Sequence, residues 1–114
     1  MTQPIPDSLN AVLAAPDHHR VVLDNERVRV LDTRIAPGDR TPVHTHRWPA
    51  VLHVLSWSPF VRYGADGTVM VDSRTIPALQ QPPNVLWSEP LEPHALENVG
   101  SVDLHILCIE LKPL

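Results

Sequence analysis

Short apolar runs in which hydrophobic and polar positions alternate fill most of this chain, and turn residues separate them. A period of two is typical of strands that bury one face, and closely spaced turns are typical of sandwiches and barrels. The runs that we expect to form strands span residues 20–23, 27–36, 42–46, 50–57, 59–63, 68–73, 84–87, 94–99 and 102–111. The pattern therefore predicts an all-β, antiparallel domain.

The start of the chain lacks this alternation and is predicted to form a short arm. Its segment DSLNAVLA predicts one short helix, with Asp7 or Ser8 as the N-cap and Pro16 as the end. Thirteen prolines argue against longer helices. We therefore divide the chain into an N-terminal arm (1–17) and a barrel domain (18–114).

Composition narrows the classes of protein that fit. A chain of 114 residues with 43% hydrophobic and 19% charged residues is expected to fold around one core. The formal net charge is −4, and the basic residues form no stripe, so nucleic acid is not expected as a partner. Cys108 is the only cysteine, which excludes an internal disulfide and a cysteine-rich zinc site and favours a buried thiol.

The N-terminal segment also bears on location. It lacks the basic start and the long apolar core of a signal peptide, and no other stretch is long and apolar enough to span a bilayer. We therefore expect a cytoplasmic protein that has no membrane partner.

Two histidines lie just before the apolar strand that begins near residue 50. Because side chains alternate along an extended chain, His44 and His46 point to the same side, roughly 7 Å apart at the backbone. His94 follows a proline and begins another alternating segment. Ligands of a metal site come from distant strands, so His94 is the candidate partner of the pair.

At this point the sequence resembles a family. The spacing from Gly38 to the HTH motif at 44–46, followed by an apolar strand, is similar to the first motif of cupins. The segment PHALEN (93–98) is similar to the second motif. The resemblance covers about residues 20 to 112 and includes both motifs in the expected order.

This resemblance implies a cupin jelly-roll barrel, an antiparallel double-stranded β-helix, with one metal in its mouth. Carried over by position, the ligands are His44, His46 and His94. Three imidazoles suit one divalent transition metal, namely zinc, iron, nickel or copper. Cupins usually add a glutamate after the second histidine, but here that slot holds Ala50 or Val51. The alternative is a barrel that keeps its histidines for hydrogen bonding only.

Three further residues are candidates for contact with a small-molecule ligand in the barrel mouth. Trp48 follows the histidine pair, Trp87 ends the strand before the second motif, and Glu92 lies in the turn before His94. Either indole can wall a pocket, although core or dimer packing fits both equally well. For Glu92, an exposed turn position is the alternative. Asn98 is expected to hold its own loop through hydrogen bonds to the backbone.

The remaining histidines are given structural roles. Strand alternation turns His53 away from the interior when Ala50 faces inward. His105 is expected to be a partly buried histidine with its hydrogen bonds satisfied. His18 and His19 precede the first predicted strand and are expected to face solvent.

Two function hypotheses follow. The first is a small metalloenzyme, dioxygenase-like or isomerase-like, that acts on a small polar or anionic molecule, with the metal as Lewis acid or oxygen activator. The second is a non-catalytic domain that binds or senses a small ligand. A homodimer is expected in both cases, because short barrels expose sheet edges and apolar outer faces that pairing would cover.

Overall fold

The structure is a computed structural model that describes residues 5–114. Its strands are β1 (His19–Asp24), β2 (Val28–Ile35), β3 (His44–His46), β4 (Ala50–Ser56), β5 (Phe60–Gly64), β6 (Val69–Asp72), β7 (Val85–Ser88), β8 (Leu91–Asn98) and β9 (Leu104–Leu111). Its helical turns are η1 (Asp7–Leu9), α1 (Ala11–Ala14), η2 (Ser73–Thr75) and η3 (Pro77–Leu79). The expected all-β architecture is therefore confirmed. None of the described helices is long and apolar enough to cross a membrane.

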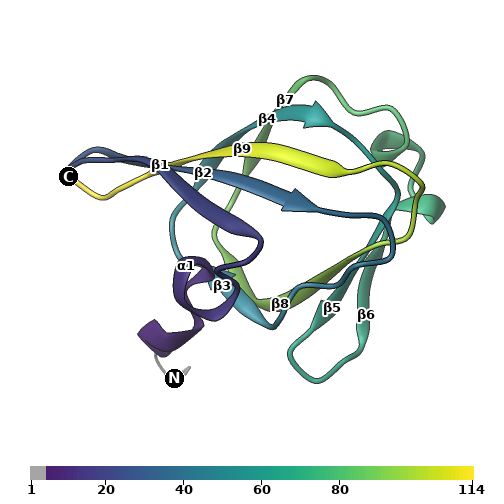
Figure 1. Cartoon of the computed structure of the whole chain (residues 1–114), viewed down its shortest axis with the longest axis horizontal. Helices are drawn as coiled ribbons and strands as arrows, with labels where there is room; N and C mark the ends of the chain where they lie inside the picture. The colour runs from purple at the N-terminus through teal and green to yellow at the C-terminus, as the bar shows by residue number, and fades with distance from the viewer. Residues whose placement is uncertain (1–4) are drawn as a thin grey trace.

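The strands form two antiparallel sheets, which Figure 1 shows as an upper and a lower layer. The five-stranded sheet has the order β1-β2-β9-β4-β7, and the four-stranded sheet has the order β3-β8-β5-β6. In this topology β9 lies between β2 and β4, and β8 lies between β3 and β5. A site between the sheets can therefore take residues from distant parts of the chain.

Inward-facing apolar side chains form the core between the sheets. One cluster consists of Ala11, Leu31 and Cys108. The other consists of Ile35, Phe60 and Leu104. Leu31 and Ile35 lie on the same face of β2 and are almost fully buried, which stabilises the fold by roughly 1.5–3 kcal/mol for each side chain. The burial of Cys108 confirms the prediction made for that thiol.

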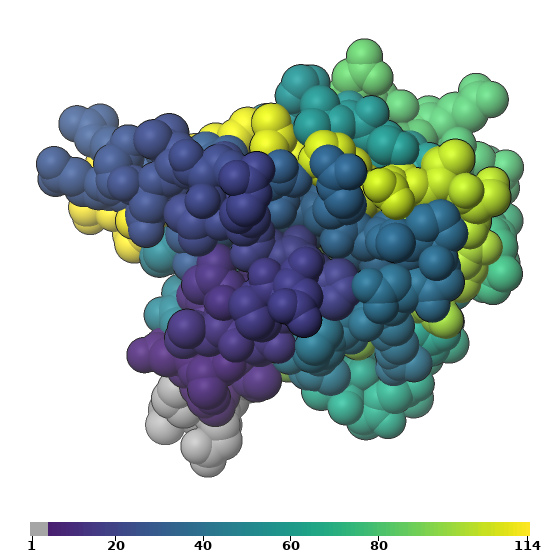
Figure 2. Space-filling model, in the orientation of Figure 1, coloured from purple at the N-terminus to yellow at the C-terminus, as the bar shows by residue number. Residues whose placement is uncertain are grey.

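The described part of the N-terminal arm is packed on the barrel, and residues 1–4 lie outside the described residues. Asn10 separates η1 from α1, and its side chain accepts a hydrogen bond from the backbone of Val12. The expected cap at Asp7 or Ser8 is therefore wrong. A backbone bridge joins Asn10 to Thr45 of β3. Figure 2 shows the purple arm lying against the dark blue β1 segment, so the arm covers one side of the barrel.

The loop before β3 is tied to the end of β8. Gly38, which has a φ of 79°, adopts a turn conformation that favours glycine, and its N–H donates to Asn98 O at 2.9 Å. The Asn98 side chain donates to the carbonyls of Ile35 and Val102, both at 2.8 Å. This agrees with the role predicted for Asn98. The ties fix the position of β3 and of the two histidines that it carries.

Candidate metal centre

β3 and β8 bring together the three histidines of the two sequence motifs. His44 and His94 are direct partners in the antiparallel pair, and His46 follows His44 by two residues on β3. The ring centroids of His44 and His94 are 4.5 Å apart, and those of His44 and His46 are 5.1 Å apart. The ring of His94 lies 5.9 Å from that of His46. The three side chains therefore meet inside one end of the barrel.

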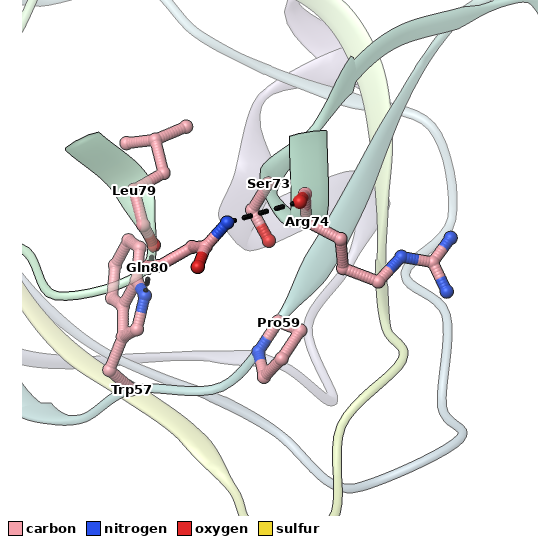
Figure 3. A pocket seen from close by; sticks show the side chains of 6 residues that line it. All are labelled: Trp57, Pro59, Ser73, Arg74, Leu79 and Gln80. Carbon is pink, nitrogen blue, oxygen red and sulfur yellow. Dashed lines mark hydrogen bonds between the residues drawn. The ribbon is translucent and has the colours of Figure 1, made fainter. Parts of the chain in front are cut away.

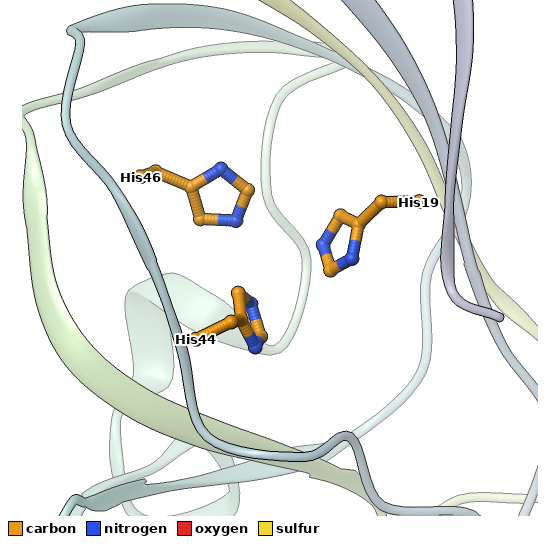
Figure 4. Close-up of side chains that lie close together, drawn as sticks. All are labelled: His19, His44 and His46. Atoms are coloured by element: carbon orange, nitrogen blue, oxygen red, sulfur yellow. The ribbon is translucent and has the colours of Figure 1, made fainter. Parts of the chain in front are cut away.

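A fourth histidine joins them from the start of β1. His19 is only 5% exposed, and one ring nitrogen from each of His19, His44 and His46 lies within 4.8 Å of the others. Figure 4 shows these three rings directed toward a common space. The expectation that His18 and His19 face solvent is thus wrong. His18 pairs with Asp39, with Nε2 and Oδ2 2.8 Å apart.

We call His19, His44, His46 and His94 the four-histidine group. In each member the Nδ1 nitrogen lies within hydrogen-bond distance of an oxygen acceptor. The acceptors are Ala15 O at 3.0 Å for His19, Pro42 O at 2.8 Å for His44, Glu110 Oε2 at 3.1 Å for His46 and Glu92 O at 2.7 Å for His94. Because these oxygens can only accept, Nδ1–H donates and the neutral ring keeps its lone pair on Nε2.

Burial favours the neutral form of three of these rings. It lowers the pKa of His19 to about 4, and the nearby His46 adds to this effect. It lowers the pKa of His44 to about 2, helped by His94, and the pKa of His94 to about 4. Near neutral pH these three rings therefore carry no proton on Nε2 and can donate its lone pair.

A buried carboxylate stands directly behind one ring of the group. Glu110 of β9 is fully buried, and its Oε1 accepts from Nε of Arg29 at 2.6 Å while its Oε2 accepts from His46. Burial by itself would raise the pKa of Glu110, but the hydrogen bonds from His46 and Arg29 hold it below its usual value. The carboxylate stays ionised and orients the His46 ring.

Glu110 lies next to the position where the first cupin motif usually has a glutamate. Ala50 is 5% exposed and faces inward, and Glu110 is its direct partner across the β4–β9 pair. Strand partners project to the same face, so Glu110 supplies a carboxylate beside the slot that Ala50 leaves without one. Sequence reasoning missed Glu110, although its place two residues after Cys108 puts a charge on the buried face of β9.

The four-histidine group lines one end of a cavity of about 150 Å³ between the sheets. The rest of the wall is mainly apolar and includes Ile35, Leu52, Phe60, Leu96, Leu104 and Ile106. Arg62 is the one lysine or arginine among the described lining residues. Trp57 lines this cavity and also an outer hollow, where its indole N–H donates to Leu79 O at 2.8 Å (Figure 3). The cavity can hold a small molecule against the histidines.

The three predicted ligand-contacting residues lie outside the described lining of this cavity. Trp48 lies under the Arg29 guanidinium, whose carbon is 5.0 Å from the ring centroid. Trp87 is 57% exposed, and its indole N–H donates to Glu89. Glu92 is exposed and lines a neighbouring groove. Their contact with a ligand stays a prediction.

The other histidines lie where strand alternation places them. His53 is exposed on the outer face of β4. His105 is partly buried, and its Nε2 lies 2.7 Å from Asp32 Oδ1, so its hydrogen bonding is satisfied as expected. Neither belongs to the four-histidine group.

The donor set of the group fits a transition metal. Neutral imidazole nitrogens are good ligands for zinc, iron, nickel and copper, and metal-binding histidines commonly donate their other ring N–H to a carbonyl or carboxylate. The Nδ1 contacts of the four-histidine group follow that arrangement. Zinc, iron, nickel or copper would be held through the Nε2 atoms, since the Nδ1 atoms are already hydrogen-bonded. The group can therefore hold such a metal.

Comparison with solved structures identifies the fold. A cupin domain from Bordetella pertussis superposes with a TM-score of 0.62 and 21% identity, over 83% of this chain and 92% of that one. An RmlC-like cupin with a double-stranded β-helix fold from Methanocaldococcus jannaschii gives 0.56 and 12%, over 82% and 78%. The polyketide cyclase RemF from Streptomyces resistomycificus gives 0.54 and 18%, over 99% and 81%. The chain therefore has the cupin double-stranded β-helix fold, which confirms the resemblance seen in the motifs.

Comparison with family profiles gives no match, and comparison with curated proteins gives no significant match. The likeness is therefore one of fold.

Proposed function

We propose that this chain binds one divalent transition metal through the four-histidine group and presents it to a small molecule in the adjoining cavity. The observation that carries this proposal is the hydrogen bonding of all four Nδ1 atoms, which leaves the Nε2 atoms of four cavity-lining histidines available. One ring nitrogen from each of His19, His44 and His46 lies within 4.8 Å of the others, and His94 is the strand partner of His44. A protein that kept these histidines for hydrogen bonding alone would not need three ring nitrogens this close to one another.

Each part of the site has a distinct task in this proposal. The metal, when bound, supplies a Lewis acid in the cavity. The backbone carbonyls of Ala15, Pro42 and Glu92 orient three of the rings. The buried Glu110 orients His46 and adds a negative charge that partly offsets the charge of a divalent ion. The apolar wall keeps water away from a bound molecule, which strengthens polar interactions there.

We propose a metalloenzyme that acts on a small polar or anionic molecule, of the dioxygenase or isomerase type. Support comes from the place of the four histidines in the wall of the cavity, where a small molecule can reach a metal that they hold. The polyketide cyclase among the fold neighbours is an enzyme, which agrees with a catalytic use of this fold.

A non-catalytic ligand-binding domain is the second candidate, and one observation favours it. Among the described residues, the cavity lining contains no aspartate or glutamate, and the nearby Glu110 is already occupied by Arg29 and His46. A free acid or base is therefore missing from the wall. Mass spectrometry of a small molecule recovered from the metal-loaded protein separates the two candidates, because a binding domain returns it unchanged.

Elemental analysis of protein purified without an immobilised-metal column tests the metal site. We expect about one transition metal for each chain, as in a mononuclear site. The variants His44→Ala, His46→Ala and His94→Ala should each lose most of it, because each removes a ligand. His53→Ala is the matched control and should keep the metal. Full metal content in all three ligand variants would refute the site.

A further inference from the structure

Arg62 is directed into the interior by the register of the four-stranded sheet. It lies on the same face of β5 as Phe60 and is the direct partner of Leu96 on β8. All three residues line the histidine cavity. The next inward position on β5 is Gly64, which is the partner of His94. Arg62 therefore lies two residues, about 7 Å of backbone, along the strand from the level of a metal-site histidine.

Five of the eight arginines have an acidic partner. In the described part of the chain, Arg27 and Arg40 have none and are exposed, whereas Arg62 has none and is partly buried. Ion pairs join Arg20 to Asp32, Arg29 to Glu110, Arg34 to Asp103, Arg47 to Asp7 and Arg74 to Asp72. Within residues 5–114, no hydrogen bond or ion pair engages the Arg62 guanidinium, although the side chain is partly buried. A partly buried cation without a partner loses part of its hydration, so this position favours a ligand that brings a negative charge.

The residues around Arg62 indicate on which side of its side chain a negatively charged ligand would bind. Arg62, Leu91 and His94 line both the inner cavity and an outer groove of about 530 Å³ beside the β5–β6 hairpin. Two carboxylates, Asp66 and Glu92, line the outer groove and would repel an anion there. No described carboxylate lines the inner cavity. An anion is therefore better placed on the inner side of Arg62.

The inner cavity also limits the size and the polarity of the ligand. Its wall is mainly apolar beyond Arg62 and the histidines, and its volume is about 150 Å³. An apolar cavity of roughly 150 Å³ is known to accommodate benzene. A guanidinium matches a carboxylate with two parallel N–H···O bonds, and a single arginine is enough for one negative charge.

We propose that Arg62 is the anion-binding residue of this cavity and that the site takes small monocarboxylic acids with an apolar, benzene-sized body. The carboxylate pairs with Arg62, and the apolar body lies between Phe60 and Leu96. Presentation of the acid to a metal rests on the proposed function. Recognition of the carboxylate by Arg62 does not, because it requires only this chain's own residues.

Benzoate and benzamide test the proposal, because they share shape and differ in charge. Binding is measured at pH 8 by calorimetry and by tryptophan fluorescence, with metal-free and metal-loaded protein. We expect metal-free protein to prefer benzoate by about tenfold or more, as for a charge-assisted hydrogen bond. Arg62→Gln should remove the preference, and Arg62→Lys should restore part of it. Arg74→Gln, which alters an arginine already paired with Asp72, is the control and should retain it.

Elemental analysis of the protein as purified, before metal is removed or added, separates this proposal from the proposed metal site. Normal metal content with no benzoate preference, or with a preference that survives in Arg62→Gln, overturns the carboxylate assignment alone. Absence of metal together with a preference that depends on Arg62 overturns only the metal proposal. Failure of the wild-type protein to bind benzoate at millimolar concentration also overturns the carboxylate assignment. Thermal melting of Arg62→Gln checks that the variant is folded.

Discussion

Nδ1 of His46 lies 3.1 Å from Oε2 of Glu110, a carboxylate with no solvent exposure that stands behind the ring on the side away from the cavity. In a cupin the glutamate of the first motif is expected on β4, whereas here the neighbouring position on β9 carries the carboxylate. The carboxylate therefore orients a metal-binding histidine here, whereas the glutamate of the first motif would bind the metal itself.

The Glu110–Arg29 pair makes a stability prediction. Glu110→Ala removes one partner and leaves a buried arginine charge, so we expect the free energy of unfolding to fall by about 3–5 kcal/mol. Urea denaturation of metal-free protein measures this. Asp103→Asn, which breaks the exposed pair with Arg34, is the control and should cost less than about 1 kcal/mol. Equal effects of the two changes would contradict a buried role for Glu110.

The inward direction of Ala50 makes a prediction about open metal positions. Ala50→Glu adds a carboxylate on the face that looks into the cavity, where it can reach a bound metal and take an open position. We expect tighter metal retention and weaker azide binding to the cobalt-loaded protein, measured by visible absorbance. Val51→Glu, on the opposite face of β4, should bind azide as the parent does. Unchanged azide binding by Ala50→Glu would show that residue 50 does not face the metal.

The buried Cys108 thiol predicts a pH effect. Burial raises its pKa from 9.0 to about 11, so the folded state holds the proton more tightly than the unfolded state does. Its contribution to stability is therefore present below pH 9 and is lost as the pH rises to about 11. At pH 8 we expect the thiol to react slowly with iodoacetamide in buffer and at the ordinary rate in urea. Rapid labelling of the folded protein would contradict its burial.

The outer face of the five-stranded sheet supports the prediction of a homodimer. Trp87, directly opposite Val51 on the neighbouring strand, is 57% exposed, and Leu55 is 47% exposed. Neighbouring exposed apolar side chains on one face of a sheet are typical of a surface that another protein chain covers. Light scattering at micromolar concentration should give twice the chain mass of 12.7 kDa, and Trp87→Asp should lower it to the monomer value. A wild-type monomer would refute the prediction.

Alternation and two motifs were enough to predict the fold and three of the four histidines, because both signals are local in sequence. His19 could not be found in this way. Its burial depends on the arm, whose Ala15 carbonyl accepts from the ring, and on the neighbouring ring of His44, and both are tertiary contacts. A charged residue on the buried face of a strand indicates a functional position, and the sequence contains such residues in β9 and β5. Glu110 lies on the same face of β9 as Cys108, and Arg62 lies on the same face of β5 as Phe60.

The metal site is tested by anomalous diffraction from crystals of the native protein, purified without added metal and measured at the absorption edge of the metal found by elemental analysis. We expect one strong peak at about 2.0–2.2 Å from Nε2 of His19, His44, His46 and His94. The absence of a peak among these atoms, coordination through Nδ1, or a peak elsewhere on the chain would contradict it.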